Sequence, residues 1–223
     1  LRNGWNGSTV GHHIVRNNVI SDCEQTGIVG SLGAIFSLIE GNHIYDIWTR
    51  RLFSGAEIGG IKIHGAIDVV IRNNRIHNAC RGLWLDWMAQ GTQITGNLFH
   101  DNNGSNPGAE HTNQDILLEV NHGPLLFANN LLLSERSLWA ISQGCAYAHN
   151  LFTGVFRLNR PGEEGRVTPA HKPHSTEMDG LHRNPVGDVR FLNNLFAQRG
   201  DASPYDNPTL PVSLAGNVFL KGA

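Results

Sequence analysis

Hydrophobic and polar positions along this chain repeat in one short unit. The unit is an apolar pair, a few polar residues, an Asn and a second apolar pair, as in IVRNNVI, VIRNNRI, LFANNLL and RFLNNLF. Its Asn occurs at eight places, namely Asn18, Asn42, Asn74, Asn97, Asn130, Asn150, Asn194 and Asn217. The intervals are 24, 32, 23, 33, 20, 44 and 23 residues, which indicates coils of roughly 20 to 24 residues with insertions in three of them.

Short segments rich in β-branched and aromatic residues lie between these Asn units, separated by Gly and Asn. No stretch keeps a helical period long enough for a crossover helix, which argues against a βαβ fold and a helical solenoid. A β-solenoid explains one Asn per coil, because Asn tolerates the left-handed conformation of a tight corner and stacked amides hydrogen-bond along a column. A leucine-rich-repeat protein would need an LxxLxL consensus that this sequence does not keep. The pattern therefore predicts an all-β fold, a right-handed parallel β-helix of about eight coils.

The 223 residues fit one β-helix domain spanning 1–223. The long intervals place insertions at about residues 48–60, 101–114 and 154–188. Loops on a rigid scaffold commonly build binding surfaces, so these insertions are candidate walls of a pocket. The last insertion is rich in Gly, Pro, His and Glu, and this composition fits disordered decoration equally well.

Composition narrows the class of ligand. The chain has 17 basic and 19 acidic residues, a balance that gives no electrostatic reason to expect nucleic acid or an anionic membrane as partner and favours a neutral ligand. Cys23, Cys80 and Cys145 have no metal-type spacing and are interpreted as small buried residues. The sequence shows neither a membrane-spanning apolar run nor a signal segment, which slightly favours the cytoplasm but leaves the compartment open.

Two acidic residues occupy equivalent places in consecutive coils. Asp86 lies 11 residues before Asn97, and Glu119 lies 11 residues before Asn130. Equal offsets place both side chains on the same face of neighbouring strands, about 4.8 Å apart, and we expect them to face solvent together. Carboxyl groups about 5 to 5.5 Å apart are typical of a retaining glycosidase, whereas an inverting enzyme needs roughly 6.5 to 9.5 Å. Two such carboxyls resist simultaneous ionisation, so one is expected to donate a proton while the other stays anionic.

Polar and aromatic residues flank this pair. Trp84 shares the outward face of its strand with Asp86, Trp87 follows directly, and Lys62 and His64 share that face in the preceding coil. Aromatic surface beside two carboxylates suits the C–H faces of a sugar ring. An alternative is that a loop covers the two Trp rings as ordinary packing, while Lys62 neutralises the row and His64 is a structural hydrogen-bonding residue.

Three segments carry a family resemblance: SGAEIGGIKIHGAIDVVIRNN, GLWLDWMAQGTQITGNLFHDN and ILLEVNHGPLLFANN. They resemble glycoside hydrolase family 120, a β-xylosidase family with a parallel β-helix, and the similarity covers about Asn18 to Asn150. The Asp and Glu motifs are its specific part, since many β-helices share the Asn repeat. The resemblance implies that Asp86 in WLDW is the nucleophile and that Glu119 in LLEVNHGP is the acid/base.

The same resemblance implies a subsite for the sugar of an oligosaccharide substrate. Neither a cofactor nor a metal is expected from the sequence. Together with the aromatic flank the resemblance gives these lining residues: Glu57, Lys62, His64, Trp84, Trp87 and His122. Glu57 could instead be a solvent-exposed loop residue. The family also carries further N-terminal coils and a β-sandwich, so the chain is expected to be a partial domain without them; a homo-oligomer is left open.

Two other functions remain possible from the sequence. A polysaccharide lyase would need a base that abstracts a proton and a cation or Arg cluster that neutralises a uronate, whereas this row holds two carboxylates and aromatic surface. A noncatalytic carbohydrate-binding or structural β-helix would not depend on either carboxylate. The glycone also stays open among xylose, arabinose and glucose.

Overall fold

A computed structural model describes residues 5–53, 57–103, 113–158 and 165–220 of the chain. Nearly all of its regular structure is β-strand, arranged in three parallel sheets and one short antiparallel hairpin. A single 3₁₀ turn, η1, spans Ser203–Tyr205 in these ranges. No helix among the described residues has the length and apolar character needed to span a bilayer.

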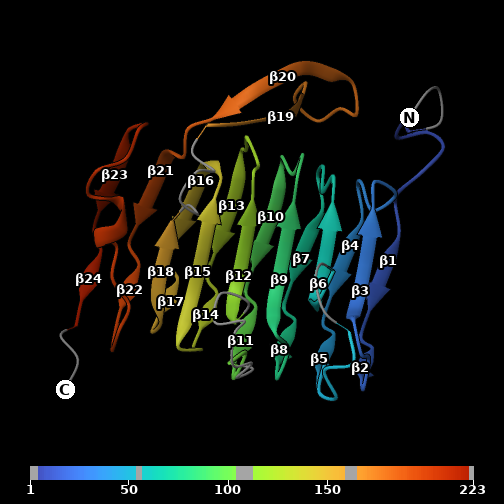
Figure 1. The fold of residues 1–223 in the computed structure, drawn as a ribbon, viewed down its shortest axis with the longest axis horizontal. Coiled ribbons are helices and arrows are strands. Elements are labelled where there is room, and N and C mark those ends of the chain that lie inside the picture. The colour runs from blue at the N-terminus through green and yellow to red at the C-terminus, as the bar shows by residue number, and fades with distance from the viewer. Residues whose placement is uncertain (1–4, 54–56, 104–112, 159–164, 221–223) are drawn as a thin grey trace.

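The three parallel sheets run side by side along the molecule (Figure 1). Sheet A contains β1 (Ile14–Arg16), β4 (Leu38–Glu40), β7 (Val70–Arg72), β10 (Thr92–Thr95), β13 (Leu125–Ala128), β16 (Gln143–Ala148), β21 (Gly187–Leu192) and β23 (Val212–Ala215). Sheet B contains β2 (Val19–Ser21), β5 (His43–Tyr45), β8 (Arg75–His77), β11 (Leu98–His100), β14 (Leu131–Leu132), β17 (Leu151–Phe152), β22 (Leu195–Phe196) and β24 (Val218–Phe219). Sheet C contains β3 (Thr26–Ser31), β6 (Gly59–His64), β9 (Arg81–Asp86), β12 (Gln114–Glu119), β15 (Arg136–Ile141) and β18 (Val155–Leu158).

Each coil adds one strand to sheet A and one to sheet B, and every neighbouring pair in these sheets is parallel. Sheets A and B each have eight strands, so the described residues form eight coils, as the eight Asn units predict. This arrangement is a parallel β-helix, and it excludes the leucine-rich-repeat alternative because three parallel sheets surround one core.

The repeating Asn residues form one continuous column of hydrogen bonds. The side-chain amide of each Asn donates to the Oδ1 atom of the Asn in the next coil at 3.0 Å, from Asn18 through to Asn217. The backbone N–H of each Asn donates to the same oxygen, at 2.9 to 3.0 Å. Buried amides are therefore paired along the whole described solenoid, which satisfies their hydrogen-bonding groups without water.

The left-handed corner residue is not the repeating Asn, which corrects the sequence interpretation. The residue before it has the positive φ instead, with 57° at Asn17, 55° at Asn73 and 66° at Gly216. Residues that tolerate this conformation are mainly Gly and Asn, and they fill most of these preceding positions. The ladder Asn can then turn its amide inward, where it also reaches a backbone carbonyl, as Asn130 does with the carbonyl of Ile94 at 2.8 Å.

Alternation along the strands of sheet C separates the core from the outer face. Ile61, Leu83, Leu85 and Leu118 are buried in the main apolar core that runs through the coils. Their immediate neighbours in sequence point to the other side of the sheet, because successive side chains of a strand alternate. This second side is the outer face of sheet C, and it carries the residues of the candidate site.

The insertion at 154–188 contains an antiparallel hairpin, β19 (Arg166–His171) with β20 (Met178–Asn184). Figure 1 shows this hairpin lying across the ends of the sheet strands. Gln90 donates to the carbonyl of Lys172, and Asn184 donates to the carbonyl of Asn121 at 2.7 Å. The hairpin is therefore packed on the solenoid, and disordered decoration is the wrong interpretation for residues 165–184.

Parts of the predicted insertions, residues 54–56, 104–112 and 159–164, lie outside the described residues. The free cysteines Cys80 and Cys145 are buried as expected, whereas Cys23 is only partly buried against the core.

Candidate active site

Asp86 and Glu119 lie side by side on two neighbouring strands of sheet C. Their Cα atoms are register partners between β9 and β12, and His64 of β6 is the register partner of Asp86 on the other side. The row His64, Asp86, Glu119 that the Asn spacing predicts is therefore present. Since Leu85 and Leu118 point into the core, the two carboxylates lie on the outer face.

Both carboxylates are less open than the sequence predicts. The Asp86 side chain is 8% exposed and that of Glu119 is 15% exposed. An apolar cluster on the outer face, separate from the main core, surrounds them and consists of Trp84, Leu117, Val120, Trp139 and Ile141. The two side chains lie on the outer face, as expected. They are nevertheless mostly buried, because the apolar cluster and the hairpin cover them.

Asp86 is held by a dense set of donors. Its Oδ2 atom lies 2.7 Å from Nε2 of His64 and 3.0 Å from the Lys62 ammonium, while Oδ1 accepts the backbone N–H of Trp87 at 2.9 Å. Burial raises the pKa of Asp86, but the His64 hydrogen bond and the Lys62 charge outweigh it, so the pKa ends below its ordinary value. The Asp86 carboxyl is therefore an oriented anion at neutral pH.

Lys62 is the cation at the centre of this network. Its side chain is fully buried, and the ammonium contacts the carboxylates of Glu57 and Asp86 and the Nδ1 atom of His64 at 2.9 Å. Ligand atoms of Glu57, His64 and Asp86 all lie within 4.8 Å of one another, a spacing that a metal ion could also use. A divalent ion would have to displace the paired ammonium, so the donor set fits Lys62 better than a metal.

Glu119 has a partner that the sequence did not reveal. Arg166, the first residue of β19, places Nη1 3.3 Å from Oε1 of Glu119, and its guanidinium lies 4.9 Å from the ring centroid of Trp87. The hairpin therefore supplies a wall of the site, in agreement with the expectation for the 154–188 insertion. Arg166 itself could not be found from the coil register, because the hairpin does not follow the repeat.

The two Trp residues differ in what they can offer a ligand. Trp84 is 5% exposed, with Lys62 4.7 Å and the Arg81 guanidinium 4.3 Å from its ring centroid. The expectation of open aromatic surface is therefore wrong for Trp84, whose ring packs against two cations. Trp87 is only half-buried and lies edge-on to His64 at 6.5 Å, so it is the aromatic side chain that borders the carboxylates.

His122 contacts both strands of the hairpin. Its Nε2 atom bonds the hydroxyl of Thr168 in β19 at 2.9 Å, and its ring packs edge-on to His182 of β20. Burial lowers the pKa of His122, which keeps the imidazole neutral at pH 7. These contacts tie His122 to the hairpin, and its role as a sugar ligand stays a prediction.

The chain belongs to the right-handed β-helix family, since the model described as "Right handed beta helix region" matches residues 3–154. This match confirms the handedness that the sequence predicts. No curated protein matches the chain.

Among solved structures the chain is similar to XylC, in the structure described as "The complex structure of XylC with xylose". The two chains are 40% identical with a TM-score of 0.85, and the match covers 98% of this chain and 37% of XylC. The resemblance to the β-xylosidases of glycoside hydrolase family 120 that the motifs carry is thereby confirmed. The chain spans well under half the length of that relative.

Proposed function

We propose that this protein is a retaining glycoside hydrolase that removes xylose from the ends of β-xylo-oligosaccharides through a covalent glycosyl-enzyme intermediate. The observation that carries the proposal is the register pairing of Asp86 and Glu119 on the outer face of sheet C. Parallel strands place equivalent side chains about 4.8 Å apart, close to the spacing of about 5 to 5.5 Å that retention requires. The likeness to a structure of XylC with xylose favours xylose as the glycone.

Asp86 is the better candidate for the nucleophile. The Lys62 and His64 contacts keep its carboxylate ionised, and the Trp87 N–H fixes the direction of its other oxygen. In the first displacement an Asp86 oxygen bonds to the anomeric carbon while the bond to the leaving oxygen breaks. In the same step Glu119 gives its proton to that oxygen.

Glu119 then acts as the base of the second displacement. It takes a proton from water, the water oxygen bonds to the anomeric carbon, and the bond to Asp86 breaks. Two inversions restore the β-configuration, and Glu119 regains the proton that it donated. We further propose that Glu57, Trp87 and the rim of the hairpin border the bound sugar, while Lys62 and His64 act through Asp86.

Azide rescue tests these two roles separately. We expect Asp86→Gly and Glu119→Gly to lose at least a thousandfold in turnover of an aryl β-xyloside. With Asp86→Gly, azide attacks the β-xyloside directly and yields the α-xylosyl azide. With Glu119→Gly, azide attacks the α-linked intermediate on Asp86 and yields the β-xylosyl azide.

Asp188→Asn is the matched control, because Asp188 pairs with Arg190 on the surface of sheet A, away from the row. Full activity is expected from it. Turnover of the xyloside that the wild type and both glycine variants share equally, or all lack, would show that the carboxylate pair does not catalyse the reaction, and an unsaturated product that absorbs in the ultraviolet would identify a lyase. Either result contradicts the proposal.

A further inference from the structure

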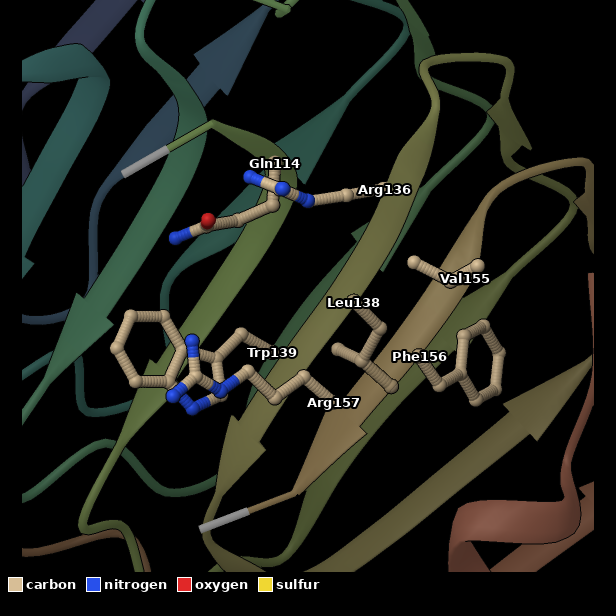
Figure 2. A pocket seen from close by; sticks show the side chains of 7 residues that line it. All are labelled: Gln114, Arg136, Leu138, Trp139, Val155, Phe156 and Arg157. Atoms are coloured by element: carbon tan, nitrogen blue, oxygen red, sulfur yellow. The ribbon is translucent and has the colours of Figure 1, made fainter. Parts of the chain in front are cut away.

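A cavity of about 350 Å³ opens on the outer face of sheet C, over β15 and β18. Its polar wall consists of Gln114, Arg136 and Arg157, and Trp139 and several apolar side chains complete it (Figure 2). This volume lies at the lower end of the range for small-molecule sites, about 300 to 1,000 Å³. None of the carboxylates of the candidate active site lines it.

The two arginines of this cavity have no acidic partner among the described residues. Elsewhere on the same face Lys62 pairs with Glu57 and Asp86, and Arg166 pairs with Glu119. The guanidinium of Arg157 instead lies 4.6 Å from the ring centroid of Trp139. The cavity therefore carries an excess of two fixed positive charges on its wall.

Gln114 adds a buried donor to the same wall. Its side chain is 2% exposed, and within the described ranges its Nε2 atom has no hydrogen-bond partner. Figure 2 shows Arg136 extending toward Gln114 at the edge of the cavity. A buried donor without an acceptor costs about 1 to 3 kcal/mol, so a ligand that supplies an acceptor would recover this energy.

The cavity continues the surface that carries the carboxylate row. Trp139 on β15 is the register partner of Leu117 on β12, two residues before Glu119. With about 3.3 Å per residue and 4.8 Å between strands, the Cα atoms of Trp139 and Glu119 are roughly 8 Å apart. An oligosaccharide whose terminal sugar sits at Asp86 and Glu119 could therefore reach this cavity with the rest of its chain.

We propose that this cavity is a subsite for an acidic sugar, so that the preferred substrates are xylo-oligosaccharides that carry a uronic acid on the leaving-group side. Arg136 and Arg157 bind the uronate carboxylate, and the Gln114 amide donates to one of the sugar oxygens. Guanidinium groups suit this role because they bind carboxylates through two parallel hydrogen bonds. This inference rests on the proposed function for the position of the cleaved bond.

The test compares an acidic with a neutral oligosaccharide of equal length. Wild-type kcat/KM is expected to be at least tenfold higher for the glucuronic-acid-substituted substrate. The difference should arise from a lower KM for the acidic substrate, and it should shrink as the salt concentration rises. Arg136→Gln and Arg157→Gln should each lose most of that preference while the neutral substrate is turned over as before. Arg190→Gln, a surface arginine of sheet A, is the matched control and should change neither.

A calorimetric titration keeps this inference separate from the proposed function. The acidic oligosaccharide is titrated into Asp86→Asn, which needs no turnover, and then into the same variant that also carries Arg136→Gln. Binding at least tenfold weaker in the second protein supports the subsite even if no xyloside is ever cleaved. Equal affinity for acidic and neutral oligosaccharides in Asp86→Asn would overturn it.

Discussion

Asp115 makes the free energy of unfolding depend on pH, and Asp115→Asn should remove this dependence. The side chain is fully buried at the start of β12, where it accepts hydrogen bonds from Asn102 at 2.9 Å and from the backbone N–H of Ser134 at 3.1 Å. Burial raises the pKa of Asp115 from 3.8 to about 7, despite these donors. The folded protein therefore holds a proton that the unfolded chain has already lost at intermediate pH.

The sign and size of the effect follow from this difference. A folded-state pKa above the unfolded value means that stability falls as pH rises from about 4 to about 7. One pKa unit corresponds to about 1.4 kcal/mol, so Asp115 alone lowers the free energy of unfolding by about 4 kcal/mol across that range. Asp115→Asn cannot ionise and should lose this part of the pH dependence, whatever constant cost the altered hydrogen bonds add.

Urea denaturation between about pH 4 and pH 8 measures the prediction. The difference in unfolding free energy between wild type and Asp115→Asn should change by about 4 kcal/mol over this window, in favour of the variant at high pH. Asp22→Asn is the control, since Asp22 is exposed and has the positive φ of 58° that Asn tolerates. A parallel pair of curves for wild type and Asp115→Asn would refute the reasoning.

Three further outcomes are expected. Asn130→Ala should destabilise the protein by about 3 kcal/mol or more, because it leaves buried amide groups of two adjacent coils unpaired; a loss below about 1 kcal/mol in urea denaturation would contradict the ladder. Lys62→Met should raise the pKa of Asp86 and move the acidic limb of the pH profile of kcat/KM to higher pH. An acidic limb at the same pH as in the wild type would show that Lys62 does not keep the nucleophile ionised. Gly82→Ala should lower the melting temperature sharply, since its Cβ would lie 2.6 Å from the next coil's backbone and 2.7 Å from a buried aromatic ring, while Gly33→Ala, with no such atom closer than 4.0 Å, should not.

The coil register could be predicted from the sequence because one local unit recurs. Each Asn of the ladder interacts with the equivalent Asn of the next coil, so equal offsets from Asn97 and Asn130 place Asp86 and Glu119 side by side. The same logic places His64 beside Asp86. Because neighbouring strands pair in parallel at the same register, the positions of these side chains can be predicted without knowing the conformation of any loop.

Contacts made by the insertion could not be predicted in the same way. Arg166 reaches Glu119 from a hairpin whose antiparallel register bears no relation to the Asn repeat. The burial of Trp84 depends on side chains such as Arg81, whose orientation a strand pattern does not specify. The left-handed residue of the first corner is Asn17 and not the repeating Asn18. The sequence could not show this, because Asn tolerates the left-handed conformation at either of the two adjacent positions.

The central claim is that two carboxyl groups one coil apart cleave the same glycosidic bond, with Asp86 as the nucleophile at the anomeric carbon and Glu119 as the acid and base. Proton NMR of an aryl β-xyloside during the first minutes of digestion tests it most directly, because the spectrum resolves the two anomers of the released sugar before they equilibrate. The stacked pair predicts that β-xylose is formed first and that α-xylose follows only by mutarotation. Initial formation of α-xylose would contradict the account.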